Sequence, residues 1–168
     1  MVEMQSQNRL WRHSFHTAIL ALHFNHSVGI GFQGEEFTAG LLHDFGRTLL
    51  AICLPERCAE LDLMDLDDNP RLLEQEQMLC GTDHCELGAW FVQENGLPEP
   101  LIDAVRYHHR PRRGVRNVKL IALTSACDQM ANHLQRYGGP EGYQPEQNTA
   151  LEILEAAGVR NAVREFTS

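Results

Sequence analysis

Apolar residues recur three and four positions apart along most of this chain, which is the spacing that places them on one face of an α-helix. Residues 8–28 show the pattern first, with Leu10, Ala18 and Leu22 on one stripe and no helix breaker between them. No segment of useful length alternates apolar and polar residues as a strand does, and no internal repeat is visible. The pattern predicts an all-α fold.

Glycines and prolines divide the pattern into separate helices. Pro55 limits the apolar stretch FTAGLLHDFGRTLLAICL, which we expect to form one helix from Glu35 onward. Asp83 is placed to cap a helix start, and Gly96 to close a helix end. The expected helices span residues 8–28, 35–54, 55–66, 71–79, 84–95, 98–108 or 98–109, 115–137 and 145–157. We therefore expect a single bundle of about six to eight helices, with a domain over 1–137 and a C-terminal helical extension over 138–168 packed on it.

The charge balance narrows the choice of partners. A net charge of -9 disfavours general nucleic-acid binding through a positive field. No apolar run reaches the roughly 18 residues needed to cross a bilayer, and the polar start MVEMQSQNRLW is unlike a secretory signal. The five cysteines include no CxxC pair, which argues against a disulfide framework and a thiolate zinc site. We expect small buried thiols in a reducing cytoplasm.

Nine histidines are the unusual part of the composition. His43 and Asp44, in LLHDFGR, could bind a metal ion together or hydrogen-bond each other at a helix end. His108 and His109 follow the apolar run LIDAV, where they could share an ion or interact with the helix dipole. Further candidates on other predicted helices are His13 in WRHSFHTA, His84 after GTD, and Asp128 in LIALTSACDQMANHL. The plain alternative is a helical domain whose histidines hydrogen-bond one another.

In this order, the residues resemble the ligand series of the HD superfamily of metal-dependent phosphohydrolases. The sequence is more closely similar to the HDOD family, the HD-related output domains of bacterial signalling proteins. The similar stretches are LWRHSFHTA (10–18), FTAGLLHDFGRTLL (37–50), EQMLCGTDHCELGAWFVQENGLPEPLIDAVRYHHRP (76–111) and IALTSACDQMANHL (121–134). The resemblance implies that residues 1–137 form an HD-type helical domain with a metal site in its core cleft.

The resemblance also implies a ligand set and a chemistry. One ion would be held by His13, His43, Asp44 and Asp128, and a second by His84, His108 and His109 with Asp44 as the bridge. Asp44 and Arg47 are the expected catalytic residues, and mixed imidazole and carboxylate ligands favour Fe, Mn, Zn or Ni. The implied function is a bacterial signalling domain that hydrolyses a phosphate ester or diester of a nucleotide. The alternative is a non-catalytic module that binds a signalling protein and keeps a structural or vestigial metal.

The HD-GYP phosphodiesterases, which cleave cyclic di-GMP, have a similar ligand series. They carry Lys at the position of Arg47, and an acidic residue and a Gly-Tyr-Pro segment after the His-His pair. This chain continues instead with Arg110-Pro111-Arg112-Arg113-Gly114, which argues against cyclic di-GMP as the substrate.

A basic segment follows the His-His pair. Six of the fourteen basic residues lie within fourteen positions, and no Asp or Glu lies between Asp103 and Asp128. The six are Arg106, Arg110, Arg112, Arg113, Arg116 and Lys119. In an acidic protein such a segment predicts a phosphate-bearing ligand, with Arg47, Arg110, Arg112 and Arg113 as the phosphate-binding residues. The alternative is a solvated loop that balances the acidic stretch 56–76.

Overall fold

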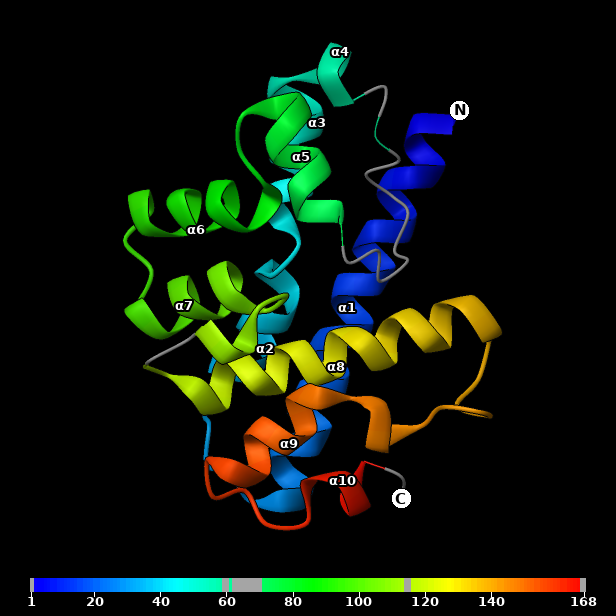
Figure 1. Cartoon of the computed structure of the whole chain (residues 1–168), viewed down its shortest axis with the longest axis vertical. Coiled ribbons are helices and arrows are strands. Elements are labelled where there is room, and N and C mark those ends of the chain that lie inside the picture. Colours follow the sequence, from blue (N-terminus) through cyan, green and yellow to red (C-terminus); the bar gives the residue numbers. More distant parts are fainter. Residues whose placement is uncertain (1, 59–60, 62–70, 114–115, 167–168) are drawn as a thin grey trace.

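The computed structural model describes residues 2–58, 61, 71–113 and 116–166, and every regular element in these ranges is a helix (Figure 1). This confirms the predicted all-α fold. The α-helices are α1 (Val2–Val28), α2 (Glu35–Leu42), α3 (Phe45–Cys53), α4 (Pro55–Cys58), α5 (Leu72–Cys80), α6 (His84–Glu94), α7 (Glu99–Tyr107), α8 (Val118–Tyr137), α9 (Thr149–Ala156) and α10 (Ala162–Glu165). Two 3₁₀ turns, η1 (Pro111–Arg113) and η2 (Pro145–Gln147), precede α8 and α9. Within the described ranges, none of the helices combines the length and the apolar character that crossing a membrane requires.

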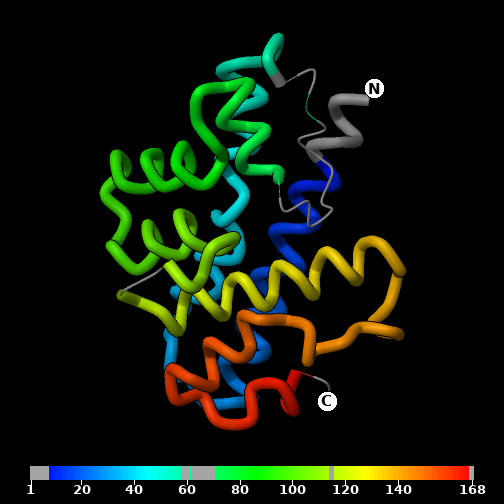
Figure 2. Tube along the Cα trace, viewed as in Figure 1, coloured from blue at the N-terminus to red at the C-terminus, as the bar shows by residue number. Residues whose placement is uncertain are grey.

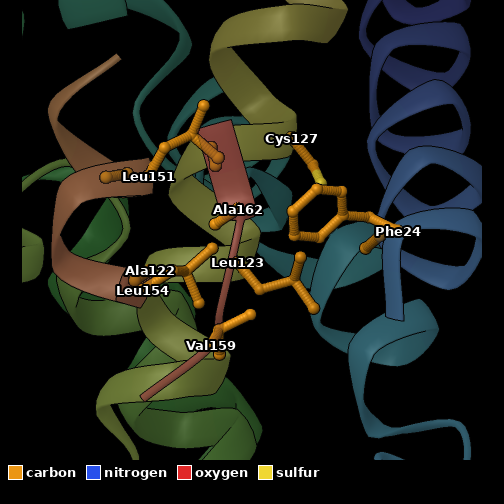
Figure 3. Close-up of a cluster of buried hydrophobic side chains, with 11 residues drawn as sticks. Phe24, Ala122, Leu123, Cys127, Leu151, Leu154, Val159 and Ala162 are labelled. Carbon is orange, nitrogen blue, oxygen red and sulfur yellow. The ribbon is translucent and has the colours of Figure 1, made fainter. Parts of the chain in front are cut away.

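The longest helices, α1 and α8, cross and pack against each other (Figure 1). On one side of this crossing α9 and α10 close a core drawn in Figure 3, which includes Phe24, Leu123, Cys127, Leu151 and Leu154. The last described helix, α10, packs against α1 (Figure 2). Next to this contact, the ring centroids of Phe24 and Phe166 are 4.8 Å apart. The C-terminal helices thus pack on the same core, while the domain division at residue 137 stays a prediction.

A second core lies among α2, α6, α7 and α8 and is built mainly from small and branched residues. Its buried members are Ala39, Ala89, Val92, Leu101, Ala104, Val105 and Leu120. The small residues let the helix backbones approach closely. A Cβ added at Gly40 on α2 would lie 2.5 Å from the Cα of Ala18 on α1, so only glycine fits at this crossing. The helices that carry the candidate ligands are thereby held at short separation.

The prediction of one helix over residues 35–54 is wrong, because the chain breaks between α2 and α3 at His43 and Asp44. His43 ends α2, and Asp44 precedes α3 with φ −99° and ψ 6°. Consecutive residues of a helix point about 100° apart, so an unbroken helix would aim these two side chains in different directions. The break lets both side chains turn into the interior, where both are buried.

Other differences are local. The helix expected from residue 115 begins at Val118, after Asn117 in the left-handed region with φ 50°. The segment expected as one helix over 145–157 starts as η2 and continues as α9. The helix expected over 55–66 is seen as α4, while residues 59–60 and 62–66 lie outside the described ranges. Cys85 and Cys127 are buried free thiols as expected, but Cys53, at the end of α3, is exposed.

Candidate metal centre

Five parts of the chain bring the seven predicted ligands together in the interior. They are the middle of α1, the turn between α2 and α3, the start of α6, the end of α7 and the middle of α8 (Figure 1). Two groups form there, and within each group the candidate ligand atoms lie within 4.8 Å of one another. We call them site 1 (His13, His43 and Asp128) and site 2 (Asp44, His84, His108 and His109). Six of these side chains are buried and His109 is half-buried.

Site 1 is compact. His13 Nε2 lies 3.0 Å from Asp128 Oδ1 and 3.2 Å from His43 Nε2, and His43 Nε2 lies 3.6 Å from the same carboxylate oxygen. Hydrogen bonds among the three side chains could explain part of this geometry, as the plain alternative requires. The convergence of two Nε2 atoms and one carboxylate oxygen is also the arrangement of a ligand set.

Asp44 lies between the two sites. Its Oδ1 is 3.4 Å from His84 Nε2 and 3.6 Å from His108 Nε2, both in site 2. Its Oδ2 is 3.6 Å from His43 Nε2 and 3.8 Å from His13 Nε2, both in site 1. Each carboxylate oxygen therefore faces a different group of histidines, which is the geometry expected of a bridging ligand.

Hydrogen bonds on the outer nitrogen orient three of the histidines. His43 Nδ1 lies 2.8 Å from the carbonyl oxygen of Gly40, and His108 Nδ1 lies 2.8 Å from that of Val105. Both nitrogens therefore donate, which leaves Nε2 as the lone-pair atom that faces the centre. His43 and His108 thus share one feature: each caps the end of a helix, and a carbonyl three residues earlier orients its ring.

Glu76 accepts the hydrogen bond from the outer nitrogen of His84, and it was not among the residues predicted from the sequence. Its carboxylate lies 2.7 Å and 2.9 Å from His84 Nδ1 and also accepts the backbone N–H of His84. Burial raises the pKa of Glu76 to about 7. Glu76 precedes His84 by eight residues on a different helix, so no helical spacing or short motif connects them. The neighbouring Asp83 was predicted correctly as the cap of α6, because its Oδ1 accepts the N–H of Glu86.

The electrostatics keep both carboxylates available as ligands. Burial by itself would raise the pKa of Asp44, but Arg47 and His43 outweigh it and hold this pKa well below its usual range. Burial also opposes ionisation of Asp128, whose pKa is nevertheless held well below its usual range by hydrogen bonds from His13 and His43. Both groups are therefore ionised at neutral pH.

The histidines fall into two electrostatic classes. Burial lowers the pKa of His84 and His109 well below the usual imidazole range, aided by Arg47 for the first and by His108 for the second. Burial also acts to lower the pKa of His43, but the carboxylates of Asp44 and Asp128 outweigh it and raise this pKa. Site 2 thus contains neutral imidazoles that can bind a cation. In site 1, His43 binds a proton more strongly than a free imidazole does, and this proton competes with a metal ion.

Several buried polar atoms at the centre lack a hydrogen-bond partner: His13 Nδ1, Asp44 Oδ2, His108 Nε2 and His109 Nε2. Such atoms are costly in a protein interior unless something binds them. A divalent transition metal would satisfy Asp44 Oδ2, His108 Nε2 and His109 Nε2. Imidazoles and carboxylates are also the donor set that such metals prefer. The cluster therefore fits a divalent metal site.

The predicted phosphate-binding residues differ in burial and in their partners. Arg47 is buried, and its Nε donates to Asp44 Oδ1 at 3.0 Å, so it belongs to the centre. Arg112 and Arg113 are exposed on η1, which packs against α8 and α9. Arg112 pairs with Glu152 at 3.4 Å.

Three of the six basic residues in the segment form ion pairs with acidic side chains. Arg106 pairs with Glu86, and Arg116 pairs with Glu99. These partners, and Glu152 for Arg112, lie outside the acidic stretch 56–76 that the solvated-loop alternative had named. Part of the positive charge of the segment is therefore neutralised on the surface.

A pocket of about 580 Å³ reaches Asp44 from the side of α1 and α3. It is lined by Asn8, Leu10, Trp11, Ser14, Leu41, Asp44, Phe45, Thr48 and Ile52. Trp11 and Ile52 are 65% and 67% exposed, so the pocket is open to solvent. The buried centre therefore has a route by which water or a small ligand can approach one of its carboxylates.

Comparison with known proteins gives a match to the HDOD domain family over residues 2–111. A protein of Treponema pallidum (strain Nichols) described as uncharacterized is 27% identical over 127 residues, which are 74% of this chain and 24% of that protein.

Solved structures share the fold. An HDOD domain protein of unknown function from Geobacter sulfurreducens aligns with a TM-score of 0.72 and 19% identity, covering 94% of this chain and 56% of that one. A protein from Shewanella amazonensis SB2B, proposed to be a phosphohydrolase, aligns with a TM-score of 0.70 and 22% identity, covering 94% and 58%. The MmoQ response regulator from Methylococcus capsulatus str. Bath aligns with a TM-score of 0.70 and 22% identity, covering 96% of this chain and 62% of that one. The chain thus spans about a quarter of the curated relative and under two thirds of each solved chain.

Proposed function

Since this chain belongs to the HDOD domain family, we propose that it is a signalling domain with a two-metal phosphohydrolase or phosphodiesterase site. The observation that carries the proposal is the position of Asp44, whose two oxygens face two separate groups of buried histidines. A single structural ion would need only one such group. Sites 1 and 2 together match the requirements of a pair of ions that share a carboxylate.

Two divalent ions, when bound, would supply an activated water and a clamp for the oxygens of a phosphate group. The protein's own residues control how water and ligands reach the metal centre. Burial of the ligands excludes bulk water from the far side of the centre, and the pocket beside Asp44 leaves the near side accessible. The identity of the ions, with Fe, Mn, Zn and Ni as candidates, is part of the proposal.

Arg47 has a defined place in this proposal. It is the expected catalytic partner of Asp44, and its hydrogen bond holds the bridging carboxylate in position. Its guanidinium also adds the positive charge that favours a phosphate beside the centre. Phosphate binding by Arg110, Arg112 and Arg113 remains a prediction, and the pairing of Arg112 with Glu152 competes with it.

The comparisons support a hydrolytic function by similarity of fold only, through the Shewanella amazonensis protein proposed to be a phosphohydrolase. A nucleotide as the substrate and a cytoplasmic location are carried forward from the sequence as parts of the proposal.

A non-catalytic signalling module is the second candidate, and one observation favours it. Six of the seven ligands are buried, as in a site that a structural metal closes. The similarity in fold to the MmoQ response regulator agrees with a role in signalling and with a protein partner. In this case the protein would bind metal and show no turnover.

Elemental analysis together with a hydrolysis assay separates the candidates, on protein purified without chelators or a metal-binding tag. We expect about two equivalents of a transition metal, and hydrolysis of p-nitrophenyl phosphate or its bis ester after reconstitution with Fe, Mn, Zn or Ni. His43→Ala and Asp128→Ala should both lower the metal content, because each removes a ligand of site 1. His23→Ala, at an exposed histidine of α1, is the matched control and should keep the full content.

Three results are informative. Bound metal without turnover of either ester or of a nucleotide panel would favour the signalling module. Unchanged metal content in both site variants would refute the site assignment. No metal after reconstitution with each ion would refute the metal centre as a whole.

A further inference from the structure

The Glu76 carboxylate makes the closest contact with any candidate ligand on its outer side. Glu76 lies on α5, is 0% exposed, and places Oε2 2.7 Å from His84 Nδ1 and 2.9 Å from the backbone nitrogen of His84. Oε1 lies 2.9 Å from the same Nδ1. One carboxylate therefore holds both the backbone and the ring of a single residue.

This contact fixes the orientation of the His84 ring. With Nδ1 donating to Glu76, the proton sits on that nitrogen and the lone pair sits on Nε2. Nε2 then points at Asp44 Oδ1, 3.4 Å away, on the side of the ring opposite Glu76. The carboxylate, the imidazole and the second carboxylate form one line from α5 through α6 to the bridging ligand.

We propose that Glu76 is a positioning residue for site 2, which holds His84 in the Nδ1–H tautomer and makes its Nε2 a stronger donor to a metal ion. The inference rests on the proposed metal centre and deepens it. Glu76 acts through His84 and is not itself among the atoms that converge on the centre. Site 1 has no such support among the described residues, because His43 donates to a neutral carbonyl.

The charge of Glu76 distinguishes it from the other outer partners. His43 and His108 donate to the carbonyls of Gly40 and Val105, whereas His84 faces a carboxylate. A carboxylate behind a ligating imidazole raises its basicity, and loss of such a partner typically weakens metal binding about 10- to 100-fold. We therefore expect site 2 to depend on Glu76 and site 1 to be indifferent to it.

The test compares Glu76→Gln with Asp83→Asn by titration of metal-free protein with Co²⁺ and Zn²⁺. Glutamine keeps an oxygen for the His84 N–H but removes the charge behind the ring. Asp83 is the matched control, because it is a buried carboxyl at the same helix start that bonds Glu86 N–H and Gln77 and makes no hydrogen bond with the His84 ring. Asparagine is also an accepted cap, so α6 should keep its start.

Asp83→Asn should bind a metal ion at site 1 and at site 2 with the same affinities as the wild type. In Glu76→Gln the ion of site 2 should bind about 10- to 100-fold more weakly. The absorption spectrum of Co²⁺ bound at site 2 should also change. Equal affinity for both ions in Glu76→Gln and the wild type would overturn the proposal.

A second measurement does not depend on a folded variant. Nitrogen-15 NMR of the His84 ring in the metal-free wild type, at pH 7.5, should show a protonated Nδ1 and an unprotonated Nε2. An Nε2–H tautomer would overturn the proposal even if Glu76→Gln fails to fold. If the wild type binds no metal, the proposed function fails, and the tautomer alone decides whether Glu76 orients His84.

Discussion

Gly46→Ala tests whether the contact between α3 and α6 sets the geometry of site 2. A Cβ at this position would lie 1.9 Å from the carbonyl oxygen of His84, 2.7 Å from its carbonyl carbon and 2.9 Å from its Cα. All three atoms are backbone, so no side-chain rotation can relieve the clash. Real contacts begin near 3.0 Å, so the two helices must separate by about 1 Å at this point. Since Asp44 precedes α3 and His84 begins α6, the same shift separates two ligands.

The expected magnitude combines two opposing effects. Overpacking a rigid contact costs up to about 3 kcal/mol, and replacing glycine by alanine in a helix regains up to about 1 kcal/mol. The net loss of about 2 kcal/mol corresponds to a fall in Tm of roughly 4–8 °C for a domain of this size. A metal site tolerates ligand displacements of only a few tenths of an ångström, so the affinity of site 2 should fall more sharply than the stability.

The assay is thermal unfolding followed by circular dichroism, together with metal titration of the same samples. Gly88→Ala is the control from the facing helix, because its added Cβ would meet the Val105 side chain at 3.0 Å and the Gly46 backbone nitrogen at 3.2 Å. We expect a smaller loss of stability in this variant and two bound ions. A Gly46→Ala protein with the Tm and metal content of the wild type would refute the reasoning.

Two further predictions concern pH and packing. Ligand imidazoles must be neutral to bind, so the raised pKa of His43 means that site 1 should release its ion at a higher pH than site 2, where the pKa of His84 is lowered. Protonation of Glu76, whose pKa burial raises to about 7, should weaken site 2 without removing a ligand. Metal content after dialysis between about pH 5 and 8 should fall in two steps, and simultaneous release of both ions would contradict the assignment. Asn148→Ala should cost about 1–2 kcal/mol, because this buried side chain caps α9 and also bonds a carbonyl of α8. Urea unfolding measures this loss, while the metal content should stay unchanged; a loss of metal would place Asn148 in the support of the centre.

The sequence was sufficient to predict the helical fold, because helical spacing is a local pattern. Its resemblance to the HD series named the seven side chains that the structure brings together. It was not sufficient to predict the break at His43 and Asp44. Apolar residues continue on both sides of the pair, and no proline lies within residues 35–54, so the apolar spacing alone favours one helix. Convergence of both side chains on one centre is a tertiary effect, and it overrides the local preference.

Glu76 and the basic segment show the same limit. The contact of Glu76 with His84 joins two helices, and one sequence contains no pattern that reports it. The arginines after His109 were clear as a run of charge, but their orientation depends on where α9 packs. The pairing of Arg112 with Glu152, forty residues away, could not be read from the spacing.

The shared carboxylate of Asp44 has a consequence for how the protein would respond to its supply of metal. A first ion draws on the negative charge that a second ion also needs, so filling one site changes the affinity of the other, and the effect is reciprocal. The sites would then fill over two ranges of free metal concentration, with a singly loaded protein between them. If turnover requires both ions, the domain would be active only over the second, higher range of free metal concentration, and Asp44 would set the interval between the two steps.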